Sequence, residues 1–200
     1  PDKIFRMKNI VLFASGSGTN AENIALFFRT LPDAEVSCIL SNRPDAGVLE
    51  RARKLNIETK VFDREMFFKS QQVLDFLLDM NPDLIVLAGF LWLVPSHIVE
   101  AFPRRIVNIH PALLPKYGGK GMYGERVHQA VIDNGEKETG ITIHYVNEEY
   151  DDGDIIFQAR CPVEPGDTPE SLAKKVHELE YKHYPQVIYQ LLKEQSPSGH

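Results

Sequence analysis

The chain has 200 residues, of which 43% are hydrophobic and 25% charged, and its formal net charge is -6. A chain of this length buries roughly 70% of its unfolded surface, which is enough for one stable core. Its composition is that of an ordinary globular protein. The acidic balance argues against a nucleic-acid partner, because phosphate backbones are bound by basic surfaces. No apolar run approaches the roughly 20 residues of a membrane span, so we expect no membrane partner.

The two cysteines, Cys38 and Cys161, have neither a metal-ligand nor a CxxC spacing. They are typical of buried thiols in a reducing compartment, so we expect a cytoplasmic protein. The histidines show no HxxxH spacing, and we expect no metal site. We expect one domain over residues 7–193, with flexible termini at residues 1–6 and 194–200. The pattern fits a monomer or a homodimer equally well.

The first half of the chain alternates short apolar runs with amphipathic stretches, as parallel strands covered by helices do. The run at residues 84–88 is entirely apolar, which is typical of a central parallel strand. The predicted strands here are residues 9–14, 35–40, 58–62, 84–88 and 106–108. The predicted helices are residues 20–29, 46–55, 63–80 and 96–102.

The second half of the chain changes character after a long loop, residues 109–124. Residues 125–133 form a predicted helix, and residues 140–146 and 154–163 form two antiparallel strands. Thr168 and Pro169 predict the start of a last helix that reaches about Leu192, with a break at Pro185. The fold class is therefore α/β: a single-domain, mostly parallel twisted sheet with helices on both faces and a Rossmann-like first half.

A glycine turn, SGSGTN at residues 15–20, lies between the first strand and the first helix. Backbone N–H groups at the start of a helix bind phosphate, so Gly18, Thr19 and Asn20 are candidates for an anion site. A dinucleotide site is poorly supported, because the second strand is followed by Ser41, Asn42 and Arg43 without an acidic residue for a ribose. A tight turn that only allows close packing is the alternative interpretation.

Two polar segments follow strands in the second half. Asn108 and His110 are two residues apart at the end of a predicted strand, so both side chains can point to one side. Residues 147–154 carry five carboxylates, which can supply a general base or orient a histidine. Local hydrogen bonding and a solvated turn are the plainer interpretations of these two segments. His144 fits a buried structural histidine as well as a site residue.

Four segments in this order resemble one known family. They are SGSGTN, NIHPALLPKY at residues 108–117, ETGITIHYVNEEYDDGDII at residues 138–156, and EYKHYP at residues 180–185. Together they resemble the glycinamide ribonucleotide formyltransferase family over nearly the whole chain. The resemblance implies the formyltransferase fold and transfer of a formyl group from 10-formyltetrahydrofolate to the amine of glycinamide ribonucleotide, in purine biosynthesis and without a metal.

The resemblance also assigns roles to residues. It implies a catalytic group of Asn108, His110 and Asp151, and substrate contacts from Gly18, Thr19, Asn20, Glu180 and His177. Folate would be bound by Arg64, Leu91, Trp92, Leu93, Val94, Val146, Asn147 and Glu148.

The chain departs from the family pattern at two places. Trp92 stands where relatives often have arginine, which removes a contact to the folate tail that Arg64 can supply. The glycine-rich loop at residues 118–124 replaces a histidine-bearing loop and suggests a lid over the substrate.

Two other functions stay open at this point. A formyltetrahydrofolate hydrolase would use the same three catalytic residues and pass the formyl group to water, although such proteins usually carry an additional regulatory domain. A non-catalytic nucleotide-binding α/β domain would use only the glycine turn. Folate analogues and glycinamide ribonucleotide should stabilise a formyltransferase, whereas NAD or FMN should stabilise the nucleotide-binding domain.

Overall fold

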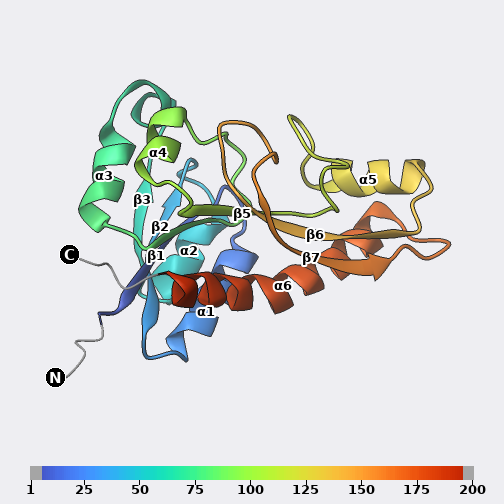
Figure 1. Ribbon diagram of the computed structural model, residues 1–200, viewed down its shortest axis with the longest axis horizontal. Coiled ribbons are helices and arrows are strands. Elements are labelled where there is room, and N and C mark those ends of the chain that lie inside the picture. The colour runs from blue at the N-terminus through green and yellow to red at the C-terminus, as the bar shows by residue number, and fades with distance from the viewer. Residues whose placement is uncertain (1–5, 196–200) are drawn as a thin grey trace. The chain divides into compact units, whose positions relative to one another are not determined.

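The computed structural model describes residues 6–195, and their contacts divide the chain into two compact units. Unit 1 comprises the chain up to Phe90 together with the residues from Ile188 onward, and unit 2 comprises Leu91–Val187. The last helix, α6 (Pro169–Glu194), contributes to both units. Figure 1 labels the helices and strands.

Unit 1 contains four parallel strands in the order β3-β2-β1-β4. The chain moves outward from β1 to β3 and then returns to β4, and right-handed crossovers place α3 on the opposite face from α1 and α2 (Figure 1). The predicted alternation of strands and helices is confirmed. The elements are β1 (Lys8–Phe13), α1 (Thr19–Arg29), β2 (Ala34–Ser41), α2 (Gly47–Lys54), β3 (Glu58–Val61), η1 (Glu65–Lys69), α3 (Gln72–Met80) and β4 (Leu84–Leu87).

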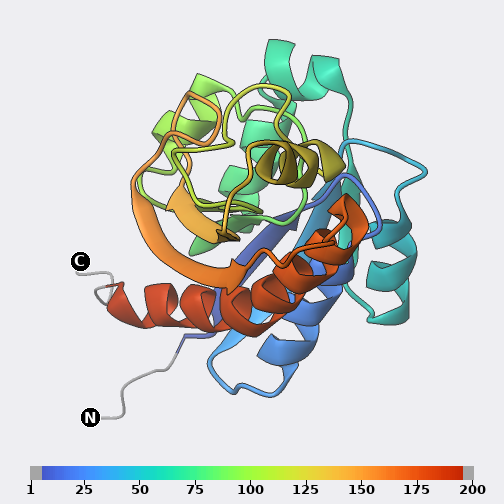
Figure 2. The same ribbon diagram turned by 90° about the vertical axis from the view of Figure 1, so that its right-hand side faces the viewer.

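Unit 2 contains three antiparallel strands in the order β5-β6-β7, and α5 and the first part of α6 lie on opposite sides of β6 and β7 (Figures 1 and 2). The prediction of antiparallel neighbours after the long loop is confirmed. The elements are α4 (Ser96–Ala101), β5 (Ile106–His110), α5 (Glu125–Asp133), β6 (Glu138–Tyr145) and β7 (Ile155–Pro162), followed by α6.

Three predicted elements differ from the structure. The helix expected over residues 63–80 is interrupted, because Ser70 is extended and separates the π-helical turn η1 from α3. Asp63 does cap the first turn, where its carboxylate accepts the N–H of Met66 at 2.9 Å. Strand β5 continues to His110, two residues beyond its predicted end, because its pairing with β6 runs that far.

The predicted break at Pro185 is wrong, since α6 is continuous through it. An interior proline removes one backbone hydrogen bond and crowds the preceding turn. Tyr184 and Ile188 flank the proline and are both fully buried, each in its own unit. The apolar surface that they bury opposes the cost of the proline, so packing overrides the local preference.

Few of the residues expected to form flexible termini lie in the described part of the chain. Arg6 pairs with Asp83 at 2.5 Å, Glu194 ends α6, and the amide of Gln195 donates to the carbonyl of Asp83 at 2.7 Å. Residues 1–5 and 196–200 lie outside the described residues.

Candidate active site

Two of the expected catalytic side chains come from one face of β5. Asn108 pairs with His144 of β6, and His110 pairs with Thr142, so these four side chains share a face of the two strands. Asn108 is half-buried, and His110 is 4% exposed. The extended end of β5 therefore brings an amide and an imidazole together, as the spacing of two residues indicates.

Asp151 reaches His110 from the acidic loop between β6 and β7. Its backbone adopts a left-handed conformation (φ 53°), and its Oδ2 lies 3.5 Å from His110 Nδ1. The same oxygen accepts the backbone N–H of Gly119 at 3.1 Å. The neighbouring carboxylates face outward, where Asp152 accepts from Asn147 and Asp154 pairs with Arg104. The loop therefore supplies one inward carboxylate, at the position that the resemblance implies.

The tautomer of His110 follows from its partners. Its Nε2 lies 2.6 Å from the carbonyl oxygen of Tyr117. A carbonyl only accepts, so Nε2 carries a proton, and Nδ1 faces the carboxylate of Asp151. A second proton on Nδ1 makes the ring an imidazolium paired with that carboxylate. The group can thus hold a positive charge next to Asn108.

Burial and the neighbouring charges act in opposite directions on His110. Burial lowers its pKa, whereas the charge of Asp151 and the Tyr117 carbonyl raise it, and the net direction is downward. For Asp151, burial raises the pKa. The neighbouring His144, the charge of His110 and the Gly119 N–H outweigh burial, so the pKa of the carboxyl is lowered overall. Asp151 is therefore ionised at neutral pH.

His144 adjoins the same cluster, and it is also buried with a partner at each ring nitrogen, so both interpretations that the sequence left open fit it. Its Nδ1 lies 2.9 Å from the carbonyl of Tyr145 and therefore carries the proton. Its Nε2 then accepts from the amide of Asn108 at 3.2 Å and lies 3.7 Å from Asp151 Oδ1. His144 thus fixes the orientation of Asn108. The contributions of Tyr117 and Gly119 come from backbone groups, which no side-chain pattern could reveal.

His128 of α5 is a third buried histidine, which sequence reasoning did not select. It is 2% exposed, and its Nδ1 has no hydrogen-bond partner among the described residues. Burial first, and then the charges of His177 and His110, lower its pKa to about 4. His128 is therefore neutral at physiological pH and adds no competing charge to the cluster.

The two expected substrate residues of the last helix, His177 and Glu180, are three positions apart and lie on neighbouring positions of the α6 surface. Burial raises the pKa of Glu180 to about 7 and lowers the pKa of His177. A carboxyl that titrates near neutrality can accept a hydrogen bond when ionised and donate one when protonated. Both residues belong to unit 2, as the catalytic cluster does.

The glycine turn lies in unit 1 and starts α1. Gly18 has φ 75°, and a Cβ on it would lie 2.3 Å from Val48 Cγ2, so both its backbone conformation and its close approach to α2 require glycine. No side chain caps the first turn of α1, which begins at Thr19. The side-chain oxygen of Asn20 is buried without a hydrogen-bond partner among the described residues. The packing and the anion-binding interpretations of this turn are compatible.

The residues expected to bind folate are distributed over both units. In unit 2, Leu91 is 47% exposed, Trp92 and Leu93 are half-buried, and Val94 is buried. Arg64 belongs to unit 1, where its guanidinium lies over the ring of Phe68 at 5.6 Å. The second unit 2 segment comprises Val146 and Asn147, which are half-buried, and Glu148, which is exposed.

Two kinds of feature are absent from residues 6–195. No group of three or more histidine, cysteine, aspartate or glutamate side chains there is arranged to hold a metal ion. None of the described helices combines the length and the apolar character that a membrane crossing needs.

Comparison with known proteins identifies the family. The formyl transferase family matches residues 8–188. A chloroplastic phosphoribosylglycinamide formyltransferase of Arabidopsis thaliana is 42% identical over 192 residues, covering 92% of this chain and 65% of the relative. The phosphoribosylglycinamide formyltransferase of Haemophilus influenzae is 39% identical over 188 residues, covering 91% of this chain and 86% of the relative.

Solved structures agree with the sequence relatives. Glycinamide ribonucleotide transformylase 1 from Symbiobacterium toebii superposes with a TM-score of 0.87 at 34% identity, covering 96% of this chain and 92% of that chain. This likeness confirms the predicted formyltransferase fold. The family match covers most of the chain, and the second relative is matched over most of its length. The chain therefore belongs to the formyl transferase family.

Proposed function

We propose that the chain transfers a formyl group from 10-formyltetrahydrofolate to the amine of glycinamide ribonucleotide. The observation that carries the proposal is the cluster in unit 2, where His110 lies 3.5 Å from Asp151 and Asn108 belongs to the same strand face. The names of the relatives support the same reaction. An amide donor, an imidazole and a carboxylate are the groups that acyl transfer to an amine requires.

The first chemical step is attack of the amine nitrogen on the formyl carbon, which forms a carbon–nitrogen bond and places negative charge on the formyl oxygen. Asn108 and protonated His110 stabilise that charge. The Asn108 amide nitrogen has two N–H donors, so it can hold His144 and still donate to the oxygen. His110 donates through Nε2 only when the formyl oxygen replaces the carbonyl of Tyr117, since that carbonyl now accepts from Nε2.

Collapse of the tetrahedral intermediate breaks the bond between the formyl carbon and N10 of the folate. The amine loses one proton, and N10 gains one when it leaves. The charge of Asp151 favours the protonated form of His110, and its carboxylate accepts the proton of the amine, directly or through a water, before the proton passes to N10. The lowered pKa of Asp151 suits the first task, because the carboxylate is ionised beside the imidazole, and it makes Asp151 a carrier that gives the proton up readily.

Binding of the two substrates uses residues outside the cluster. The start of α1 at Gly18, Thr19 and Asn20 would bind the substrate phosphate through N–H groups that lack partners inside the helix. Glu180 would accept from the ribose hydroxyls, and His177 would contact the phosphate. The pterin ring of the folate would be bound mainly by the backbone of residues 91–94 and 146–148. Arg64 would pair with the acidic folate tail.

An absorbance assay tests this proposal. Purified protein with 10-formyltetrahydrofolate and glycinamide ribonucleotide should produce the absorbance change of deformylated folate, and omission of the amine should abolish it. A hydrolase would give the same change without the amine. Protection from thermal unfolding by NAD alone would favour the nucleotide-binding alternative, which the named relatives do not support.

A further inference from the structure

The segment that follows His110 is held by one buried hydroxyl on β6. Thr142 is fully buried, and its hydroxyl donates to the carbonyl of Ala112 at 2.7 Å and accepts the N–H of Leu114 at 3.0 Å. A hydroxyl has one donor and two acceptor positions, so one acceptor position is left. Both ends of the turn at residues 112–114 are therefore fastened to a single side chain.

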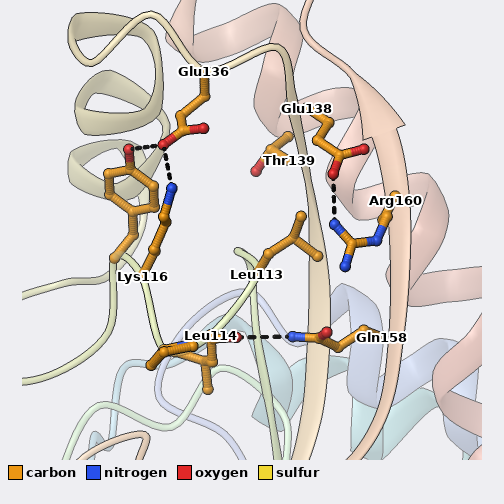
Figure 3. A pocket seen from close by; sticks show the side chains of 10 residues that line it. Leu113, Leu114, Lys116, Glu136, Glu138, Thr139, Gln158 and Arg160 are labelled. Atoms are coloured by element: carbon orange, nitrogen blue, oxygen red, sulfur yellow. Dashed lines mark hydrogen bonds and ion pairs between the residues drawn. The ribbon is translucent and has the colours of Figure 1, made fainter.

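Gln158 of β7 occupies the remaining position. It pairs with Thr142 in the sheet, so both side chains lie on the same face. Its Nε2 donates to Thr142 Oγ1 at 2.9 Å and to the carbonyl of Leu114 at 3.1 Å, and Figure 3 shows the second of these bonds. One amide thus satisfies the hydroxyl and binds the same turn directly.

The segment is held at both of its ends. A cavity of about 240 Å³, open to solvent, borders it and is lined by residues 113–117 together with Glu136, Glu138, Thr139, Gln158 and Arg160 (Figure 3). The Tyr117 hydroxyl donates to Glu136 at 2.7 Å, and Lys116 donates to the same carboxylate at 3.2 Å. Gln158 and Thr142 therefore hold the start of the segment, and Glu136 holds its end.

The segment links His110 to one of its own hydrogen-bond partners, the carbonyl of Tyr117. It starts two residues after His110 and leads to Tyr117, whose carbonyl accepts from His110 Nε2. We propose that Gln158 is a positioning residue for formyl transfer, which fixes the turn at residues 112–114 and through it the orientation of His110. The two hydrogen bonds of Gln158 go to Thr142 and Leu114 and not to a catalytic side chain, and the proposal rests on the role proposed above for His110.

Gln158→Met tests this role, because methionine keeps the length of the side chain and removes both donors. Small displacements of a catalytic group are costly, so kcat should fall about tenfold or more. The KM values for both substrates should stay within about twofold, since the hydrogen bonds of Gln158 go to Thr142 and Leu114, which are not assigned to binding. A loss of kcat without a matching rise in KM separates positioning from binding.

The pH profile of kcat/KM gives a second readout, because it reports the free enzyme, in which the Tyr117 carbonyl still accepts from His110. Asp151 and His144 are the titratable groups whose charges act on His110, together with the carbonyl of Tyr117, which raises its pKa. If the segment moves, that carbonyl contact weakens, and the alkaline limb of the profile should move to lower pH in Gln158→Met. A merely structural role would change the amount of folded protein and leave the profile in place.

Arg160→Gln is the matched control. Arg160 lies two residues further along β7 and lines the same cavity, but its partner is Glu138 on the surface, at 2.6 Å. This variant should keep the kcat and pH profile of the parent. Gln158→Glu is the second test variant, since it keeps the shape and loses the amide donors, and it should show the same defects as Gln158→Met.

Three outcomes would overturn the proposal: parent kcat in folded Gln158→Met, a rise in KM at unchanged kcat, or failure of both Gln158 variants to fold. The variant His110→Ala, measured in parallel, tests the proposed function itself. In the His110→Ala background, Gln158→Met should cause little further loss, because the imidazole that it positions is gone. If His110→Ala is inactive while Gln158→Met is fully active, only the role of Gln158 fails.

Discussion

The glycine turn of unit 1 and the histidine cluster of unit 2 are built in different ways. The turn uses six consecutive residues, 15–20, that lead from the end of β1 into α1, and its anion-binding potential comes from backbone groups at the start of a helix. The cluster takes side chains from β5 and, more than 30 residues further along the chain, from β6 and the loop that follows it. The first site is a local structure, whereas the second exists only when the strands pair in one register.

This difference decides how each site responds to substitution. A backbone site tolerates most side-chain changes but not a change of conformation, so Gly18 should be its most sensitive position. A side-chain cluster is sensitive to the identity of each group, because each carries a distinct charge or proton. Substitutions in the cluster should therefore lower activity without lowering stability. Substitutions in the turn should lower stability more than activity.

The largest effects are expected from His110→Ala and Asp151→Asn. Removal of the imidazole takes away a charged donor to the formyl oxygen, and kcat should fall by about 10³-fold. Asp151→Asn keeps the shape but cannot hold the imidazolium, and kcat should fall by about 10²-fold. Steady-state kinetics measure both losses, and thermal unfolding should show folded proteins.

Asp154→Asn controls for the charge of the acidic loop. Its carboxylate pairs with Arg104 on the surface, and both side chains are mostly exposed, so its ion pair adds little stability. This variant should have parent activity. Equal losses in Asp151→Asn and Asp154→Asn would mean that the loop acts through its overall charge, and the cluster would lose its catalytic assignment.

A smaller effect on catalysis, but a larger one on stability, is expected from Gly18→Ala. The added Cβ would lie 2.3 Å from Val48 Cγ2 at a left-handed backbone position. Relief of this overlap requires movement of α1 against α2, which costs about 1–3 kcal/mol and lowers Tm by several degrees. The KM for glycinamide ribonucleotide should rise at the same time.

Gly16→Ala is the matched control for the turn, because a Cβ there meets nothing within 4 Å and its φ is ordinary. It should keep the parent Tm and KM. A lowered Tm with an unchanged KM in Gly18→Ala would support the packing interpretation of the turn and remove its phosphate role.

The sequence predicts the local features of both sites well. The β1-turn-α1 pattern identifies the glycine turn, and the alternation of β5 places Asn108 and His110 on one side. The pairing of β5 with β6, which brings His144 to Asn108, depends on the register of residues 36 positions apart. Local patterns contain no information on that register, so they do not predict the contact of His144 with Asn108.

The two incorrect helix predictions also relied on local sequence alone. A proline breaks an isolated helix, but residues buried on both sides of Pro185 hold α6 continuous. At Ser70 the error has the opposite sign: the amphipathic pattern predicts a continuous helix, whereas the backbone becomes extended. The roles of the Tyr117 carbonyl and the Gly119 N–H could not be predicted, because every residue carries these groups and only the fold directs them at His110 and Asp151.

The smallest effect is expected from Glu180→Gln, and it depends on pH. Burial raises the pKa of Glu180 from 4.5 to about 7, so between these values the folded protein binds a proton that the unfolded chain has released. The stability of the parent should therefore decrease as pH rises from about 5 to 7 and lose this dependence above the folded pKa, whereas Glu180→Gln should lack this part of the slope. Urea unfolding at several pH values measures the difference, with Glu178→Gln, an exposed position on the same helix, as the control.

If the ionised carboxylate of Glu180 also accepts from the ribose, the KM of the parent for glycinamide ribonucleotide should fall by roughly threefold as pH passes 7, in keeping with one hydrogen bond. A KM that changes with pH equally in the parent and in Glu180→Gln would assign that change to another group and restrict Glu180 to a structural role.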